Sequence, residues 1–89
     1  MRHWFTPSEV RSELPPEIAR AVQGWMLERE VGELSLEPLG RYYAVRFNAA
    51  ASPVPGVYLP ASTLESAADL LDLLQTALEI YYDEMNLDQ

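Results

Sequence analysis

The hydrophobic pattern changes its period twice along the chain, and each change marks a boundary between predicted elements. Over residues 16 to about 29, apolar residues recur every three or four positions, which indicates a helix with one buried face. Apolar and polar residues alternate over residues 33–47, as in strands that bury one face. The helical period returns over residues 63 to about 85. The core positions of the first of these segments are predicted to be Ile18, Val22, Trp25 and Met26.

A shorter helix is predicted ahead of this pattern. Thr6-Pro7-Ser8-Glu9 combines a threonine N-cap, a proline at the first helical position and a glutamate three residues after the cap. Leu14 must leave the helical conformation because a proline follows it. The next helix begins at Pro16, so we expect two helices in the first third of the chain.

The alternating segment predicts a hairpin followed by a third strand. Prolines at positions 53 and 55 indicate a loop over residues 48–56. Residues 57–59 then form a third strand before Pro60, and three strands are about the minimum for a sheet supported by helices. The inward positions of the hairpin, on either side of a turn at 38–40, are expected to be Leu34, Leu36, Tyr43, Val45 and Phe47.

The last helix is the most regular segment of the chain. Ser62-Thr63-Leu64-Glu65 forms a second capping box and opens it. The predicted fold is therefore a single small α+β domain over residues 1–89 with the order α-α-β-β-β-α. It has two N-terminal helices, a three-stranded antiparallel sheet and a long C-terminal helix packed on the sheet. The apolar stripe of that helix comprises Leu64, Ala67, Leu71, Leu74, Leu78, Tyr81 and Met85.

The order α-β-β-β-α in the later part of the chain resembles the topology of double-stranded-RNA-binding domains. In that family, lysines at the start of the last helix contact phosphates. Ser62, Glu65 and Asp69 occupy the corresponding region of this sequence. The resemblance is therefore one of element order, and the RNA-binding function is not transferred.

Charge divides the chain into two unlike halves. The sequence has 14 acidic and 6 basic residues, a net charge of −8 and a pI near 4.4. Every basic residue is an arginine within residues 1–46, whereas residues 47–89 carry seven acids and no base. This strongly negative net charge argues against direct binding of nucleic acid through its phosphates. Cysteine is absent, which excludes a disulfide scaffold, a thiolate metal site and a cysteine nucleophile.

The sequence offers little support for catalysis or for a bound cofactor. The only histidine, His3, lies at a terminus that we expect to be mobile, without a nearby acid or nucleophile. No calcium loop, histidine pair or glycine-rich phosphate loop is present. The string Gly40–Phe47 has the aromatic and basic residues of an RNA-binding strand, but a half-buried strand explains the same alternation. We expect neither an enzyme nor a metal or cofactor site.

No segment has the length and apolar character of a signal peptide or a membrane span. We therefore expect a cytoplasmic protein with no membrane partner.

One face of the last helix collects carboxylates. At 100° per residue, five acids fall within an arc of about 80° opposite the leucine stripe, and the helix contains no lysine or arginine. Leu73 and Ile80 border this row and form an apolar seam if they are exposed. The alternative is a solvated face that aids solubility, with both residues widening the core. The predicted partner-binding residues are Glu65, Asp69, Asp72, Leu73, Glu79, Ile80 and Asp83.

These features favour an interaction protein over an enzyme. The leading hypothesis is a small acidic inhibitor of the anti-CRISPR or anti-restriction type, encoded by a phage or plasmid. Its acidic helix docks into a basic nucleic-acid-binding groove of a target protein. The alternative is an acidic homodimeric chaperone or assembly adaptor that keeps its acids for solubility. In that case the dimer forms through Leu70, Leu73, Ala77 and Ile80.

Overall fold

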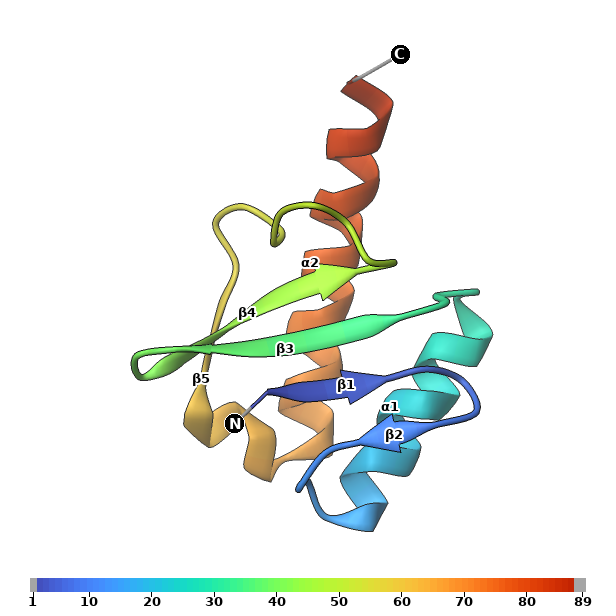
Figure 1. The fold of residues 1–89 in the computed structure, drawn as a ribbon, viewed down its shortest axis with the longest axis vertical. Helices are drawn as coiled ribbons and strands as arrows, with labels where there is room; N and C mark the ends of the chain where they lie inside the picture. Colours follow the sequence, from blue (N-terminus) through green and yellow to red (C-terminus); the bar gives the residue numbers. More distant parts are fainter. Residues whose placement is uncertain (1, 88–89) are drawn as a thin grey trace.

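The computed structural model describes residues 2–87 and shows an antiparallel sheet with two α-helices behind it (Figure 1). Within these residues the sheet has five strands in the order β2-β1-β3-β4-β5. Both helices lie against one face of the sheet, and no helix of the described residues covers the other face (Figure 1). Along the chain the elements are β1 (His3–Phe5), β2 (Val10–Arg11), α1 (Pro16–Glu28), β3 (Leu34–Leu39), β4 (Tyr42–Phe47), β5 (Tyr58–Pro60), the 3₁₀ helix η1 (Ala61–Glu65) and α2 (Ala67–Leu87).

The predicted helix after Thr6 is wrong, because this segment is the turn between β1 and β2. The backbone N–H of Thr6 donates to the carbonyl of Glu9 at 2.7 Å, and the N–H of Glu9 donates to Thr6 Oγ1 at 3.0 Å. The second of these bonds also occurs in a helical capping box, where the third residue after the cap donates to the cap side chain. The local pattern is therefore compatible with both a capped helix and a tight hairpin turn.

The N-terminal hairpin makes the sheet larger than the predicted three strands. β1 pairs with β3 in the register His3↔Leu36 and Phe5↔Leu34, and β2 pairs with the other edge of β1. The prediction of two N-terminal helices and a three-stranded sheet is therefore wrong. From α1 to α2 the order of helices and strands is α-β-β-β-α. The N-terminal strands were missed because each is only two or three residues long, too short for a period to be read.

The first predicted core helix and the hairpin after it are confirmed. α1 begins at Pro16, and its four predicted core residues are all buried. β3 and β4 pair along their length, with Leu34 opposite Phe47 and Leu36 opposite Val45 on the inner face. Gly40 has a φ of +65° in the connecting turn, a conformation that glycine adopts without a steric penalty.

The last helix begins later than its capping box predicts. Residues 61–65 form η1, and Ser66 is extended, with φ −130° and ψ 119°. Ser66 Oγ accepts the N–H of Asp69 at 3.4 Å, so Ser66 is at the N-cap position of α2. The buried face of α2 also differs from the predicted stripe, because α2 contacts both α1 and β4. Its buried residues are Leu70, Leu74, Ala77 and Leu78, whereas Leu71 and Tyr81 are half-buried and Met85 is exposed.

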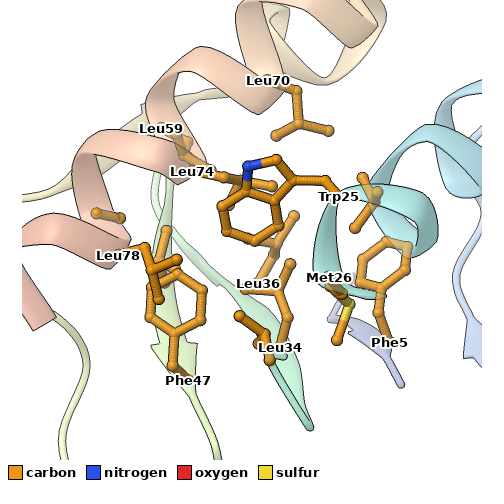
Figure 2. Close-up of a cluster of buried hydrophobic side chains, with 14 of the residues drawn as sticks. Phe5, Trp25, Met26, Leu34, Leu36, Phe47, Leu59, Leu70, Leu74 and Leu78 are labelled. Atoms are coloured by element: carbon orange, nitrogen blue, oxygen red, sulfur yellow. The ribbon is translucent and has the colours of Figure 1, made fainter. Parts of the chain in front are cut away.

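A single hydrophobic core fills the space between the sheet and the two helices. Figure 2 shows Trp25 of α1 between the leucines of α2 and the inner side chains of the strands. Trp25 also stacks at a tilt on Phe47, with ring centroids 6.2 Å apart. Phe5 from β1 lies beside Met26 in the same cluster (Figure 2). The N-terminal strand is therefore part of the core rather than an appendage.

We predict that Phe5→Ala lowers the free energy of unfolding by about 3–5 kcal/mol, because the phenyl ring is fully buried and its loss leaves a cavity. Trp4→Ala is the matched control. Trp4 points to the opposite face of the same strand and is only half-buried, so its loss is expected to cost about 1 kcal/mol. Urea denaturation measures both values. Equal costs for the two variants would contradict the placement of β1 in the core.

His3 is held inside the fold, contrary to the expectation of a mobile terminus. Its side chain is 5 % exposed, its Nδ1 lies 2.7 Å from Ser12 Oγ, and its ring packs against Tyr43 at a centroid distance of 5.4 Å. Burial lowers the pKa of His3 from its ordinary value of 6.5, and the nearby carboxylate of Glu13 opposes this only in part. The folded state therefore favours the neutral imidazole.

This burial predicts a pH-dependent stability. Because the pKa of His3 is lower in the folded than in the unfolded chain, the unfolded chain binds a proton first as the pH falls through 6.5. The wild-type protein should lose stability between about pH 7.5 and pH 5.5, and His3→Gln should lose less over the same interval. Urea midpoints at both pH values provide the measurement. The same pH dependence in both proteins would show that His3 titrates alike in the two states.

Candidate functional site

Four of the five predicted carboxylates form an exposed row on α2. We call Asp69, Asp72, Glu79 and Asp83 the acidic α2 row, and all four side chains are exposed. The row spans 14 residue steps, or about 21 Å at 1.5 Å per residue. Glu65 is exposed too but lies at the end of η1, and the extended Ser66 separates it from the helix. Glu65 therefore does not continue the helical spacing of the row.

The acidic α2 row has no cationic partner among residues 2–87. The ion pairs in this part of the chain join Arg2 and Arg46 to Glu37, Arg11 to Glu9, and Arg29 to Glu28. None of them involves a carboxylate of α2. Carboxylates spaced three or four residues apart on a helix repel one another by a few tenths of a kcal/mol per pair. The row therefore destabilises the isolated helix slightly, and a cationic partner would relieve this repulsion.

An open groove of about 680 Å³ runs between α1 and α2 beside this row. Asp69 and Asp72 line it from α2, and Glu28 and Arg29 line it from α1. Arg29 bridges the two helices, because its Nε donates to Gln75 Oε1 while its guanidinium stacks over the ring of Trp25 at 5.1 Å. Glu28 of α1 therefore lines the same groove as Asp69 and Asp72 of α2. The periodicity of a single helix cannot predict that these residues are neighbours, because they lie on different helices. The remaining lining residues are Ala21, Gly24, Ala68 and Leu71.

The apolar residues beside the acidic row are turned toward the core. Leu73 and Ile80 are half-buried and pack against the hydrophobic cluster, so they widen the core face of α2. Leu70 and Ala77, which a homodimer seam on this helix also requires, are fully buried in the chain's own core. The seam expected for a homodimeric chaperone is therefore not present as an exposed surface of α2.

A second candidate surface lies on the sheet face that faces away from the helices. The sequence pattern did not predict this surface. Strand pairing places Arg11 opposite Trp4, Trp4 opposite Ser35 and Ser35 opposite Arg46, all on this face. Alternation along β3 and β4 indicates which of their residues point outward. Trp4 and Arg11 lie on the two N-terminal strands, which the sequence pattern did not predict. We call this the outer sheet face; its exposed or half-buried members include Arg2, Trp4, Arg11, Glu37, Leu39, Tyr42, Arg46 and Tyr58.

The outer sheet face is cationic and aromatic, unlike the rest of this acidic protein. The guanidinium of Arg11 lies 5.1 Å from the ring centroid of Trp4. Arg46 Nε lies 3.1 Å and Arg2 Nη2 lies 3.8 Å from the same oxygen of Glu37, so one carboxylate serves two arginines. The string at residues 40–47 divides between the faces: Tyr42 and Arg46 point outward, whereas Tyr43, Val45 and Phe47 point inward.

Neither a metal-binding group nor a comparison with known proteins assigns a function to this chain. Among the residues that the structure describes, no group of three or more histidine, cysteine or acidic side chains is arranged to hold a metal ion. None of the helices within 2–87 combines the length and apolar character needed to cross a membrane. No family model, curated protein or solved structure matches the chain. The candidate functional features of the chain are therefore the acidic α2 row and the outer sheet face.

We predict a measurable coupling across the groove between Arg29 and Gln75. Their side-chain hydrogen bond joins α1 to α2, and a double-mutant cycle with Arg29→Ala and Gln75→Ala should give a coupling energy of about 0.5–1.5 kcal/mol. Thermal or urea unfolding of the four proteins provides the energies. The control cycle pairs Arg20→Ala, an exposed position on α1, with Gln75→Ala and should be additive within about 0.5 kcal/mol. Additivity in both cycles would contradict the bridge.

Proposed function

We propose that this protein is a small acidic inhibitor that binds another protein through the acidic α2 row. The observation that supports the proposal most is the row itself: four exposed carboxylates on one helical face, with no arginine paired to any of them within residues 2–87. A surface of this kind recognises arginines and lysines, and charge complementarity gives such contacts their specificity and association rate.

The proposed target is a basic nucleic-acid-binding groove on a cytoplasmic effector, such as a restriction or CRISPR enzyme met by a phage or plasmid. Spacing limits how far the row resembles nucleic acid. Four carboxylates over about 21 Å are sparser than one phosphate per 3.4 Å on each DNA strand. Glu28, on the far side of the interhelical groove, is already paired with Arg29 at 3.3 Å and does not extend the row. The mode we propose is therefore a few charge pairs that block the groove, rather than a copy of the duplex.

The test is capture of a partner from the native host by tagged protein, followed by mass spectrometry. We expect the triple variant Asp69→Lys, Asp72→Lys and Glu79→Lys to lose the partner that the wild-type protein retains, because three attractive contacts become repulsive. Retention should also fall as salt is raised from about 0.05 to 0.5 M, since exposed charge pairs are screened.

A matched control separates the row from net charge. Glu13→Lys, Glu17→Lys and Glu30→Lys change the net charge by the same amount at exposed positions outside α2 and should leave capture intact. Circular dichroism checks that both triple variants fold. If the folded α2 variant captures the partner as well as the wild-type protein does, the acidic α2 row is not the binding surface.

A further inference from the structure

The outer sheet face has the composition of a protein interface but nothing covers it within residues 2–87. Tyrosine, tryptophan and arginine are the residues most enriched at the energetic centres of interfaces, and this face presents all three. Its large apolar side chains are unusually open, with Leu39 56 %, Tyr42 47 % and Tyr58 56 % exposed. Both helices lie over the inner face of the sheet, whose apolar residues are buried (Figure 1). The outer residues, by contrast, are exposed to solvent.

The charged and apolar parts of this face occupy different ends of the strands. One row across the sheet, the arginine row, contains Arg11, Trp4 and Arg46. Another, the apolar row, contains Leu39, Tyr42 and Pro60. Arg46 and Tyr42 are four residues apart on β4, so the two rows are about 13 Å apart at 3.3 Å per residue.

α2 exposes a matching sequence of side chains. Its acidic row begins with Asp69 and Asp72, and its only exposed large apolar residues with described side chains, Tyr82 and Met85, follow toward the C-terminal end. Asp72 and Tyr82 are ten residues apart, or about 15 Å along the helix. Tyr82 also lies about 80° round the helix axis from Asp72. A helix laid along the strands therefore places Asp72 on the arginine row and Tyr82 on the apolar row.

We propose that α2 of a second copy of this chain docks on the outer sheet face. The proposal rests on the acidic α2 row being a docking surface, as in the proposed function, and adds that the protein carries a basic surface of its own. The two contacting surfaces differ, so the interface is heterologous, and repetition of the same contact builds head-to-tail rings or open chains. Self-association then competes with binding of an outside partner for the same carboxylates.

Charge favours this occupant over the alternatives. Two outer sheet faces packed symmetrically bring arginines against arginines. A nucleic acid brings a continuous row of phosphates to a chain of net charge −8. Two copies also repel each other at long range, but at about 0.15 M salt the screening length is about 8 Å. Facing charges then dominate over the distant ones.

The first measurement is the mass of the wild-type protein by sedimentation equilibrium at about 0.15 M salt. We expect monomers at about 10 µM and dimers or longer species as the concentration approaches about 1 mM, the range of a small interface opposed by net charge. A wild-type protein that stays monomeric throughout this range overturns the proposal.

The second measurement uses two complementary variants made at exposed positions. The sheet variant carries Arg11→Glu and Tyr42→Ser, and the helix variant carries Asp72→Arg and Tyr82→Ser. Each variant lacks one of the two surfaces and should be monomeric alone. Mixed together, they should form a 1:1 dimer that does not grow, because the intact α2 of one meets the intact sheet of the other. Arg20→Glu, on α1, is the control and should associate like the wild-type protein.

Each alternative gives a different result. A helix variant that dimerises alone indicates a symmetric sheet-to-sheet contact and overturns the proposal, as does a mixture that stays monomeric. Binding of a fluorescein-labelled oligo(dT) strand that is lost in the sheet variant, with the wild-type protein monomeric, assigns the face to nucleic acid instead. The proposed function is judged separately, because the sheet variant keeps the acidic α2 row and should still capture an outside partner even when self-association is absent.

Discussion

Antiparallel pairing of β3 with a strand on each side, β1 and β4, organises the whole fold. β3 lies at the centre of the sheet, and its inward residues Leu34 and Leu36 are fully buried. Pairing with β4 aligns Val45 and Phe47 beside them. Pairing with β1 brings in the N-terminus from about thirty positions away along the chain. With all five strands in one sheet and both helices on one side, the inner face becomes the core and the outer face remains open.

This one-sided arrangement explains how a net charge of −8 coexists with a cationic surface. Strand alternation sends Arg2, Arg11 and Arg46 to the open face of the sheet, where Glu37 and Glu9 are their partners. The carboxylates of the acidic α2 row are exposed on a helix that lies against the other face of the sheet (Figure 1). The division of charge along the sequence thus becomes a division in space, and both proposals use it: one for an outside partner and one for a second copy.

Two capping-box patterns in the chain show how a local signal misleads. At Thr6 the expected side-chain bond to Glu9 forms, but it closes a hairpin turn because the residues before it pair with β3. At Ser62 the pattern falls within η1, and Ser66 caps the helix four residues later. A side-chain oxygen that accepts an N–H three residues on stabilises a turn as well as a helix. The conformation of the flanking residues, set by tertiary contacts, decides between them.

The amino-acid pattern alone was enough to predict α1, the β3–β4 hairpin, a long last helix and the concentration of acids on the exposed side of that helix. Each of these depends on a period that repeats within one segment, and burial of one face enforces that period. Three features become visible only in the folded chain: the N-terminal pair of strands, the inward orientation of Leu73 and Ile80, and the outer sheet face with its arginine and aromatic residues. These features join residues such as His3 and Leu36, whose contact no local period records. The regular segments pack first in this sense: their packing leaves one edge of β3 free for the N-terminal strand and leaves space in the core for additional side chains.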